Sequence, residues 1–164
     1  MAALRVGIVG AGGITRHHAP SWKALGATVS VHELEGAAGL ADEFDLTVAA
    51  TMAELLGTVD MVDICTPATT HCDVALQAVA AGVPIVCEKP IGATFDEAMI
   101  LAAAARAAGV LVLPAHVVRF FGQYAAMQAA VAAGRIGRPA ILRFIRGGSG
   151  PTRTGSSTRR CPVA

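Results

Sequence analysis

Residues 4–15 read LRVGIVGAGGIT, and this stretch is the most informative of the chain. The apolar, β-branched run at its start is typical of a buried strand, and Gly10 ends it. Glycines at Gly10, Gly12 and Gly13 allow a tight turn and a close approach of the backbone to a pyrophosphate. A helix that begins near Ile14 would stabilise the phosphate charge with its N-terminal amides. The stretch therefore predicts a strand, a dinucleotide-binding turn and a helix in succession.

The residues around this turn bear on which dinucleotide it would hold. Glu33 follows the next predicted strand, 23 residues after Gly10, and is well placed to bind a ribose 2′-hydroxyl. Its carboxylate would repel a 2′-phosphate, so NAD is expected rather than NADP, although Arg16 near the turn could reach such a phosphate. The third position of the usual glycine pattern is Thr15. A structural glycine turn without a ligand is the alternative interpretation.

Strands and helices alternate beyond the turn, with short connections marked by Gly or Pro. This order is typical of an α/β fold, a doubly wound parallel sheet of the Rossmann type with helices on both faces. Local signals support it, among them a capping box formed by Thr94 and Glu97. The predicted strands are 4–9, 28–32, 46–48, 61–65, 83–87 and 110–113, and the predicted helices are 14–25, 36–44, a helix after Thr51, 69–79 and 94–108.

The chain changes character after about residue 118. Residues 1–118 are expected to form the dinucleotide-binding domain, and 119–147 the beginning of a second, incomplete α/β domain with a helix at 123–133 and a strand at 140–145. The remaining residues, 148–164, are rich in Gly, Ser, Thr, Arg and Pro and are expected to be disordered. The strand at 140–145 would present an unpaired apolar edge, which predicts self-association.

Composition excludes several classes of protein. Hydrophobic residues make up 54% of the 164 residues and charged residues 15%, which excludes a disordered chain. No acidic residue follows Glu97, whereas nine of the 13 basic residues do. These arginines are dispersed and mostly lack aromatic neighbours, so the expected partners do not include nucleic acid. The apolar stretch 98–118 is interrupted by Arg106, Gly109 and Pro114, so no membrane span is expected.

The four cysteines and five histidines suggest no metal site. The cysteines have no CxxC spacing and are interpreted as small buried hydrophobes of a cytoplasmic protein. His17 and His18 are adjacent, and neighbours on a helix point apart. His116 is interpreted as a packed residue at a strand end.

Two strand ends carry further candidate residues. Thr66 and Pro67 follow the apolar strand 61–65, in which Asp63 is the one polar residue, and Glu88 and Lys89 follow the strand 83–87. Ligands lie at the carboxyl edge of a doubly wound sheet, so all four would face the same site. Lys89 could act as a general acid/base toward a substrate hydroxyl, or it could be a surface lysine in a turn.

These motifs together resemble the Gfo/Idh/MocA family of NAD(P)-dependent oxidoreductases. The resembling segments span about residues 4 to 147 and are VGIVGAGGI from Val6, ICTPATTHC from Ile64, CEKPIG from Cys87, and HVVRFF from His116 with GRIGRP from Gly134. The resemblance implies a Rossmann domain followed by an α/β domain with an open sheet. It also implies hydride transfer between a nicotinamide ring and a sugar, polyol or related hydroxyl or carbonyl compound.

The resemblance assigns roles to individual residues. The glycine turn, with Gly13 and Ile14, and Glu33 would hold the dinucleotide. Thr66, Pro67 and His71 would lie at the nicotinamide, and Lys89 would meet the reacting oxygen. Glu88 is a further candidate for cofactor binding. His71 could equally cap a helix or face solvent.

Members of this family continue for some two hundred residues beyond the segment that resembles residues 4 to 147. The chain is therefore expected to be a C-terminally truncated member. Two functional classes remain open: an oxidoreductase impaired by truncation, with a small-molecule substrate at full length, or a non-catalytic nucleotide-binding or interaction remnant.

Overall fold

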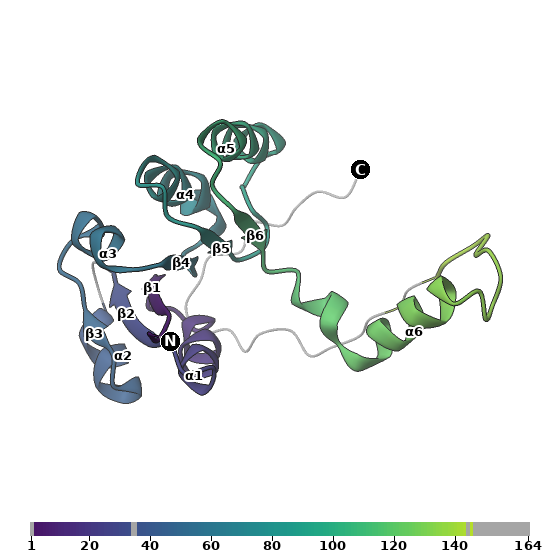
Figure 1. Cartoon of the computed structure of the whole chain (residues 1–164), viewed down its shortest axis with the longest axis horizontal. Helices are drawn as coiled ribbons and strands as arrows, with labels where there is room; N and C mark the ends of the chain where they lie inside the picture. The colour runs from purple at the N-terminus through teal and green to yellow at the C-terminus, as the bar shows by residue number, and fades with distance from the viewer. Residues whose placement is uncertain (1, 34–35, 144, 146–164) are drawn as a thin grey trace. The chain divides into compact units, whose positions relative to one another are not determined.

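A computed structural model describes residues 2–33, 36–143 and 145. Contacts between backbone segments divide the chain into two units, Met1–Arg119 and Phe120–Ala164. The first unit is a six-stranded parallel sheet with the order β3-β2-β1-β4-β5-β6 (Figure 1). Its strands are β1 Arg5–Val9, β2 Thr28–His32, β3 Thr47–Val48, β4 Met61–Ile64, β5 Ile85–Cys87 and β6 Val112–Pro114. The doubly wound α/β fold is thus confirmed.

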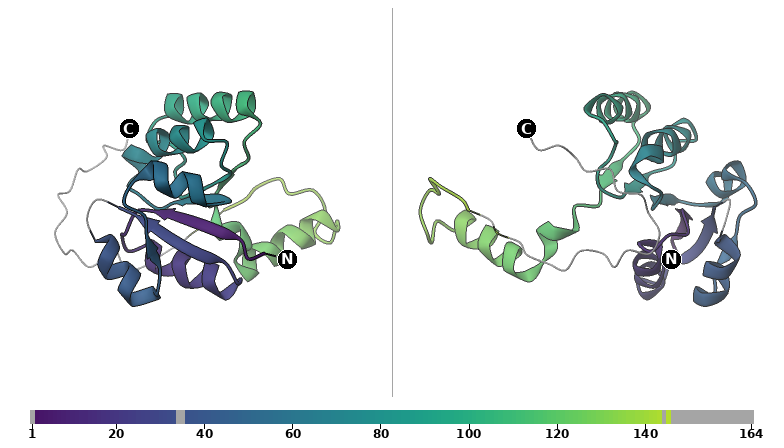
Figure 2. Two further views of the ribbon diagram at one scale, coloured as in Figure 1. Left: turned by 60° about the vertical axis from the view of Figure 1, so that its left-hand side comes forward. Right: turned by 180° about the vertical axis from the view of Figure 1, so that it is seen from behind.

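Helices cover both faces of this sheet (Figure 2). Two of them, α1 Thr15–Ala24 and α2 Ala37–Phe44, pack on one face, and α3 Met52–Thr58, α4 His71–Ala80 and α5 Phe95–Ala108 pack on the other. Short 3-10 helices lie at Ala68–Thr70 (η1) and Val117–Phe120 (η2). The change of face occurs around β1, whose neighbours are β2 and β4. The order of strands reverses at this point, where ligands bind in doubly wound sheets.

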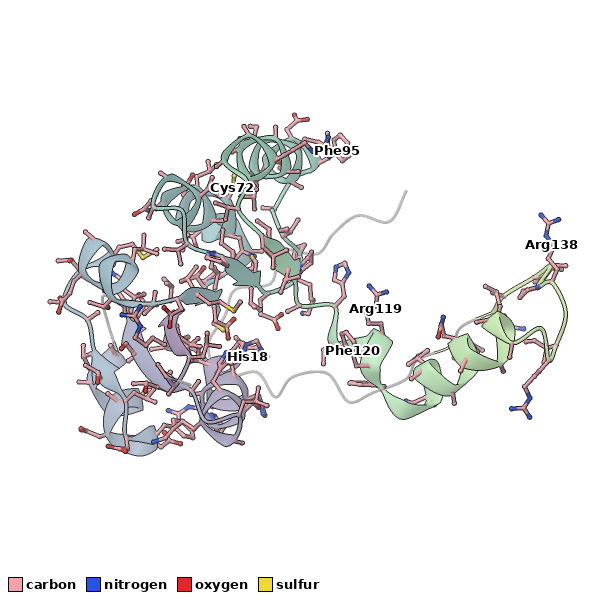
Figure 3. The ribbon with its side chains drawn as sticks, viewed as in Figure 1. His18, Cys72, Phe95, Arg119, Phe120 and Arg138 are labelled. Atoms are coloured by element: carbon pink, nitrogen blue, oxygen red, sulfur yellow. The ribbon has the colours of Figure 1, made fainter. Side chains whose placement is uncertain are left out.

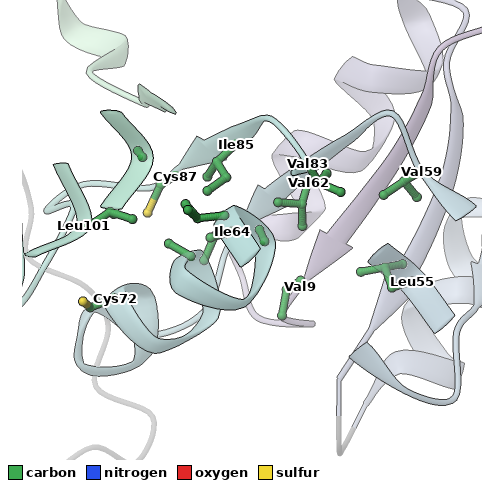
Figure 4. Packing of buried hydrophobic residues seen from close by; sticks show 14 of the residues in the cluster. Val9, Leu55, Val59, Val62, Ile64, Cys72, Val83, Ile85, Cys87 and Leu101 are labelled. Carbon is green, nitrogen blue, oxygen red and sulfur yellow. The ribbon is translucent and has the colours of Figure 1, made fainter. Parts of the chain in front are cut away.

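The larger core lies between the sheet and helices α3 to α5 (Figure 4). Ile64, Ile85 and Leu101 are fully buried in it. Successive residues of a strand point to opposite faces, so Val62 and Ile64 of β4 face this core and Asp63 and Cys65 face α1. Small apolar side chains, mostly Val, Ile and Ala, fill both layers, as the low aromatic content requires.

The helix boundaries follow local chemistry. Thr94 and Glu97 form the predicted capping box at the start of α5, and Gly109 ends this helix with a positive φ of 68°. Thr51 caps α3 by accepting a hydrogen bond from the Glu54 amide. Thr70 occupies the N-cap position of α4, as one of the two predicted cap residues. Its side chain does not cap the helix, however, because the hydroxyl donates to the Pro67 carbonyl in η1.

In the described residues of the second unit, one α-helix is present, α6 Gly122–Ala132, and no residue of this helix is buried. The strand predicted at 140–145 is wrong for residues 140–143 and 145, which form no regular element. A strand needs a hydrogen-bonded neighbour, and no neighbour is present among the described residues of this unit. The expected self-association therefore loses its strand edge and is left with exposed side chains such as Ile141 and Leu142. The expected disorder of 148–164, and Phe144, lie outside the described residues.

Two smaller expectations can also be compared with the structure. None of the helices in the described ranges is both long and apolar enough to cross a membrane. Cys65, Cys72 and Cys87 are buried free thiols, as predicted, while Cys161 lies outside the described residues.

Candidate functional site

The parallel register brings the predicted site residues to one edge of the sheet. Gly10 follows β1, Glu33 follows β2, Cys65 and Thr66 follow β4, and Glu88 follows β5. Backbone hydrogen bonds tie these ends together: the Gly10 amide donates to the His32 carbonyl at 3.0 Å, and the Glu88 amide donates to the Ile64 carbonyl at 3.0 Å. Segments far apart in the sequence thus converge at the carboxyl edge.

Gly10 is required at its position for two independent reasons. Its φ of +110° lies in a region that side-chain-bearing residues rarely adopt. A Cβ atom at this position would also lie 2.8 Å from the carbonyl carbon and oxygen of Cys65. Gly12 and Gly13, by contrast, are exposed, and a Cβ atom there would meet no atom within 4 Å. The turn is therefore constrained at Gly10 and open at its outer side, where a ligand could approach.

Thr15 has a role of its own in place of the usual small third residue. It is fully buried, and its hydroxyl donates to the Gly10 carbonyl at 2.8 Å. The side chain thereby ties the start of α1 to the end of β1. Ile14 occupies the N-cap position without a side-chain cap, and it is 39% exposed. The first-turn amides of α1 thus remain without a side-chain acceptor and suit an anionic group.

Glu33 and Arg16 bear on the choice between NAD and NADP. Glu33 is half-buried directly after β2. Arg16 forms an ion pair with Glu43 of α2. The arginine nearest the glycine turn is thus already paired with a carboxylate.

The end of β4 carries an unpaired polar atom. The Thr66 hydroxyl oxygen is buried, and no hydrogen-bond partner for it occurs in the part of the chain that the structure describes. Pro67 next to it is exposed. Buried hydroxyls almost always have a partner, so an orphaned one at this edge fits a site completed by a ligand.

His71 lies beneath the site rather than in solvent. The residue is 1% exposed, with Nδ1 at 2.7 Å from the Pro90 carbonyl and Nε2 at 2.8 Å from the Thr66 carbonyl. The ring therefore connects the end of β4 to the turn after β5. The alternative of a solvent-facing His71 is wrong.

Lys89 faces open space. Its side chain is 64% exposed and lines a cavity of about 540 Å³ together with His116 and Val117–Arg119. The Lys89–Pro90 peptide bond is cis. His116 is exposed after β6, so its interpretation as a packed residue is wrong. An amine and an imidazole thus line the same cavity, and both kinds of group can transfer protons.

A polar cluster that was not predicted from the sequence lies between α1 and the sheet. Asp63, in the central strand β4, is fully buried. Its Oδ2 accepts a hydrogen bond from Trp22 Nε1 at 2.6 Å. The same oxygen lies 2.8 Å from Nδ1 of His18, the side chain labelled in Figure 3. His18 and Trp22 are four residues apart, so they lie on the same face of α1. Two features of the sequence could have indicated this cluster: the single acidic residue in an apolar strand, and the four-residue spacing of His18 and Trp22.

Electrostatics of the cluster favour a protonated His18. The hydrogen bond to Asp63 raises the pKa of His18 above its ordinary value, and the charges of Asp63 and Glu88 add to this effect against the opposing effect of burial. Burial, together with the Asp63 charge, raises the pKa of the Cys65 thiol.

Potential ligand atoms of His18, Asp63 and Cys65 lie within 4.8 Å of one another, a spacing at which three groups can hold a metal ion. However, a hydrogen-bonded network describes the cluster better. Asp63 Oδ2 already has two partners, and a raised thiol pKa opposes the thiolate that zinc requires.

Comparisons with known proteins agree with this arrangement. The family described as "Oxidoreductase family, NAD-binding Rossmann fold" (GFO_IDH_MocA) matches residues 4–116. The chain is 39% identical over 95 residues to a 1,5-anhydro-D-fructose reductase of Ensifer adhaerens, covering 57% of this chain and 28% of that protein. It is 32% identical over 150 residues to an inositol 2-dehydrogenase of Pseudomonas syringae, covering 85% of this chain and 45% of that protein.

A solved structure has the same fold. It is a UDP-N-acetylglucosamine 3-dehydrogenase from Acidithiobacillus ferrooxidans, with a TM-score of 0.74 and 30% identity, covering 79% of this chain and 42% of that one. The chain thus spans less than half the length of these relatives. The family match includes the glycine turn and every strand of the sheet. The chain therefore belongs to the Gfo/Idh/MocA family of oxidoreductases with an NAD-binding Rossmann fold.

Proposed function

We propose that the chain binds NAD at the carboxyl edge of its sheet and takes part in hydride transfer to or from a sugar-like or polyol-like substrate. The observation that carries the proposal is the convergence of the Gly10 turn, the orphaned Thr66 hydroxyl and Lys89 at one edge. The named activities of the relatives, an inositol dehydrogenase and an anhydrofructose reductase, support a substrate with hydroxyl or carbonyl groups.

Each part of the cofactor would meet a different segment. The backbone of Gly10, Gly12 and Gly13 and the N-terminus of α1 at Ile14 would hold the pyrophosphate. Thr66 and Pro67 would lie at the nicotinamide, with the Thr66 hydroxyl as a hydrogen-bond partner. His71 would support this part from below, because its ring fixes the Thr66 carbonyl. When bound, the nicotinamide supplies the carbon that accepts or donates the hydride.

NAD rather than NADP is supported by charge. Glu33 would accept hydrogen bonds from the ribose hydroxyls, whereas a 2′-phosphate would be repelled by its carboxylate. Arg16 would be a poor phosphate ligand while it is paired with Glu43.

Lys89 would handle the proton of the reaction. In the oxidation of an alcohol, the neutral amine at Nζ takes the hydroxyl proton while the hydrogen on the same carbon leaves as hydride, and a carbonyl forms. The reverse direction returns the proton from the ammonium to the new hydroxyl oxygen. The exposed position of Lys89 in its cavity allows a substrate to reach Nζ and allows the proton to exchange with water.

One observation supports a second candidate function, nucleotide binding without turnover. Helix α6 buries none of its residues, so it contributes no core to a substrate domain. In this case NAD would bind and no substrate would be oxidised. The buried free thiols support a reducing compartment such as the cytoplasm for either function.

Calorimetric titration with NADH and NADPH tests cofactor binding. We expect NADH to bind at least about tenfold more tightly than NADPH. Glu33→Gln should lower this ratio of affinities, because the repulsion of a 2′-phosphate is removed. Asp42→Asn, at an exposed carboxylate on α2, is the matched control and should leave the ratio unchanged. Tighter binding of NADPH, or no binding of either nucleotide, would overturn the proposal.

A screen of sugars and polyols, monitored by nicotinamide absorbance, tests turnover. Lys89→Met should leave NADH binding intact and lower turnover by about 100-fold or more. Lys23→Met, at the other lysine of the chain, is the control and should retain the rate. If NADH binds and no compound is turned over, the non-catalytic candidate is favoured.

A further inference from the structure

The carboxylate of Glu88 is shared between two basic groups. Its Oε1 lies 3.3 Å from His18 Nε2. Its Oε2 accepts a hydrogen bond from the backbone amide of Lys89 at 3.1 Å and lies 4.0 Å from Lys89 Nζ. The Glu88 side chain is 9% exposed, whereas that of Lys89 is 64% exposed. A nearly buried carboxylate therefore connects a partly buried histidine to the exposed candidate acid/base.

His18 itself is held firmly from the other side. Its Nδ1 lies 2.8 Å from Oδ2 of the fully buried Asp63, which Trp22 also contacts. Both ring nitrogens thus face carboxylates, and a carboxylate only accepts hydrogen bonds. An imidazolium, which carries a proton on each nitrogen, satisfies both contacts at once. The hydrogen bond to Asp63 raises the pKa of His18, which favours this form.

We propose that His18 is a positioning residue for Lys89, acting through Glu88. By holding Oε1 and compensating part of the negative charge of Glu88, the imidazolium keeps this carboxylate from closing onto the Lys89 ammonium. A closed ion pair would favour the ammonium, which cannot accept a proton. The inference rests on the proposed role of Lys89 in proton transfer.

A purely structural role for His18 would require less than this geometry provides. Neutralising Asp63 needs Nδ1 alone, yet Nε2 is aimed at the one carboxylate beside Lys89. The charged and titratable groups that face the ring are Asp63 and the Cys65 thiol from the β4 segment and Glu88 from the segment after β5. Among the residues that the structure describes, the ion-pair partners of Glu88 are His18 and Lys89.

The chain offers a clean experiment because Lys23 and Lys89 are its two lysines. The full chain without nucleotide is treated with an amine-reactive ester between pH 6 and 9, and the labelling of each lysine is measured by mass spectrometry. We expect His18→Gln to lower the labelling of Lys89 relative to Lys23 by about three- to tenfold at pH 8. His17→Gln, at the exposed neighbouring histidine, is the control and should change the ratio by less than about twofold.

Rescue and pH dependence separate positioning from a loss of structure. Glu88→Gln added to His18→Gln should restore the Lys89 ratio, because the carboxylate that would close onto the ammonium is gone. In the unaltered chain the ratio should fall as pH rises through the titration of His18, followed by NMR of its ring. This second measurement needs no variant and therefore holds even if His18→Gln does not fold.

The outcomes are distinct from those for cofactor binding. An unchanged ratio in a folded His18→Gln chain, or a ratio that does not follow the His18 titration, would overturn the inference. Labelling requires neither nucleotide nor turnover, so a failure to bind NADH would overturn the proposed function and leave this measurement unaffected.

Discussion

Helices α5 and α6 are both rich in alanine, yet they have very different surroundings. The first begins with a capping box and buries Leu101 and Ala105 against the sheet. The second has no side-chain cap and buries none of its residues. Alanine supplies the helix propensity in both cases, but of these two described helices only α5 packs its apolar residues into a core. An alanine-rich helical sequence therefore does not by itself determine whether a helix of this chain is buried.

Replacing one isoleucine by alanine in each unit should give the largest difference in the free energy of unfolding. Ile64→Ala, at a fully buried residue of β4, should lower the free energy of unfolding by about 2–5 kcal/mol, because lost burial and a cavity add together. Ile141→Ala, at a side chain that is 90% exposed, should change it by less than about 0.5 kcal/mol. Urea denaturation followed by circular dichroism measures both changes in unfolding free energy. Similar losses of stability for the two variants would contradict the difference in burial between the two units.

Two glycines with positive φ give a smaller contrast. Gly10→Ala adds backbone strain and a contact of 2.8 Å with Cys65, so a loss of about 2–4 kcal/mol is expected. Gly134→Ala adds strain at a φ of +68° with no atom within 4 Å, and about 1 kcal/mol is expected. Thermal unfolding of both variants provides the test. Equal shifts in Tm would mean that crowding at the glycine turn is unimportant.

The capping box distinguishes the start of α5 from the start of α4. Thr94→Ala should cost about 1 kcal/mol, because the Glu97 amide loses its acceptor. Thr70→Ala is the matched control, since this threonine also precedes a helix but bonds to the Pro67 carbonyl instead; about 0.5 kcal/mol or less is expected. A larger loss for Thr70 than for Thr94, measured by urea denaturation, would contradict the role of the capping box.

The smallest effect concerns acid. A side-chain hydrogen bond from Arg5 lowers the pKa of Asp60 from 3.8 to about 2. A depressed carboxyl pKa stabilises the folded state above pH 4, and this contribution is lost as pH falls from 4 to about 2. The stability difference between the unaltered chain and Asp60→Asn should therefore shrink over this range. The chain has no acidic residue after Glu97, so the helical signal of the second unit should not follow this titration.

Features encoded by neighbouring residues could be predicted from the sequence. The Gly10 turn, the Thr94–Glu97 capping box and the alternation of strands and helices along the Rossmann unit depend on short patterns, and the structure contains all of them. The strand at 140–145 was wrong because an apolar run becomes a strand only beside another strand. Its sequence carries no information on whether that neighbour exists.

The buried cluster could be predicted only in part. Asp63 was visible as the single polar residue of an apolar strand, but its partners His18 and Trp22 lie 45 and 41 residues away in the sequence. Pairing them requires knowing that α1 packs on the face of β4 to which Asp63 points. Similarly, the orphaned hydroxyl of Thr66 depends on the packing around it and not on the motif.

The hydrogen bond from Trp22 to Asp63 gives this protein an optical property. Trp22 is the only tryptophan of the chain, and its indole N–H lies 2.6 Å from the carboxylate that also holds His18. Its tryptophan emission therefore comes from a single site, and we expect this emission to respond to the protonation state of the neighbouring imidazole. The chain carries a built-in fluorophore at the polar cluster, readable without dye or label in the intact protein.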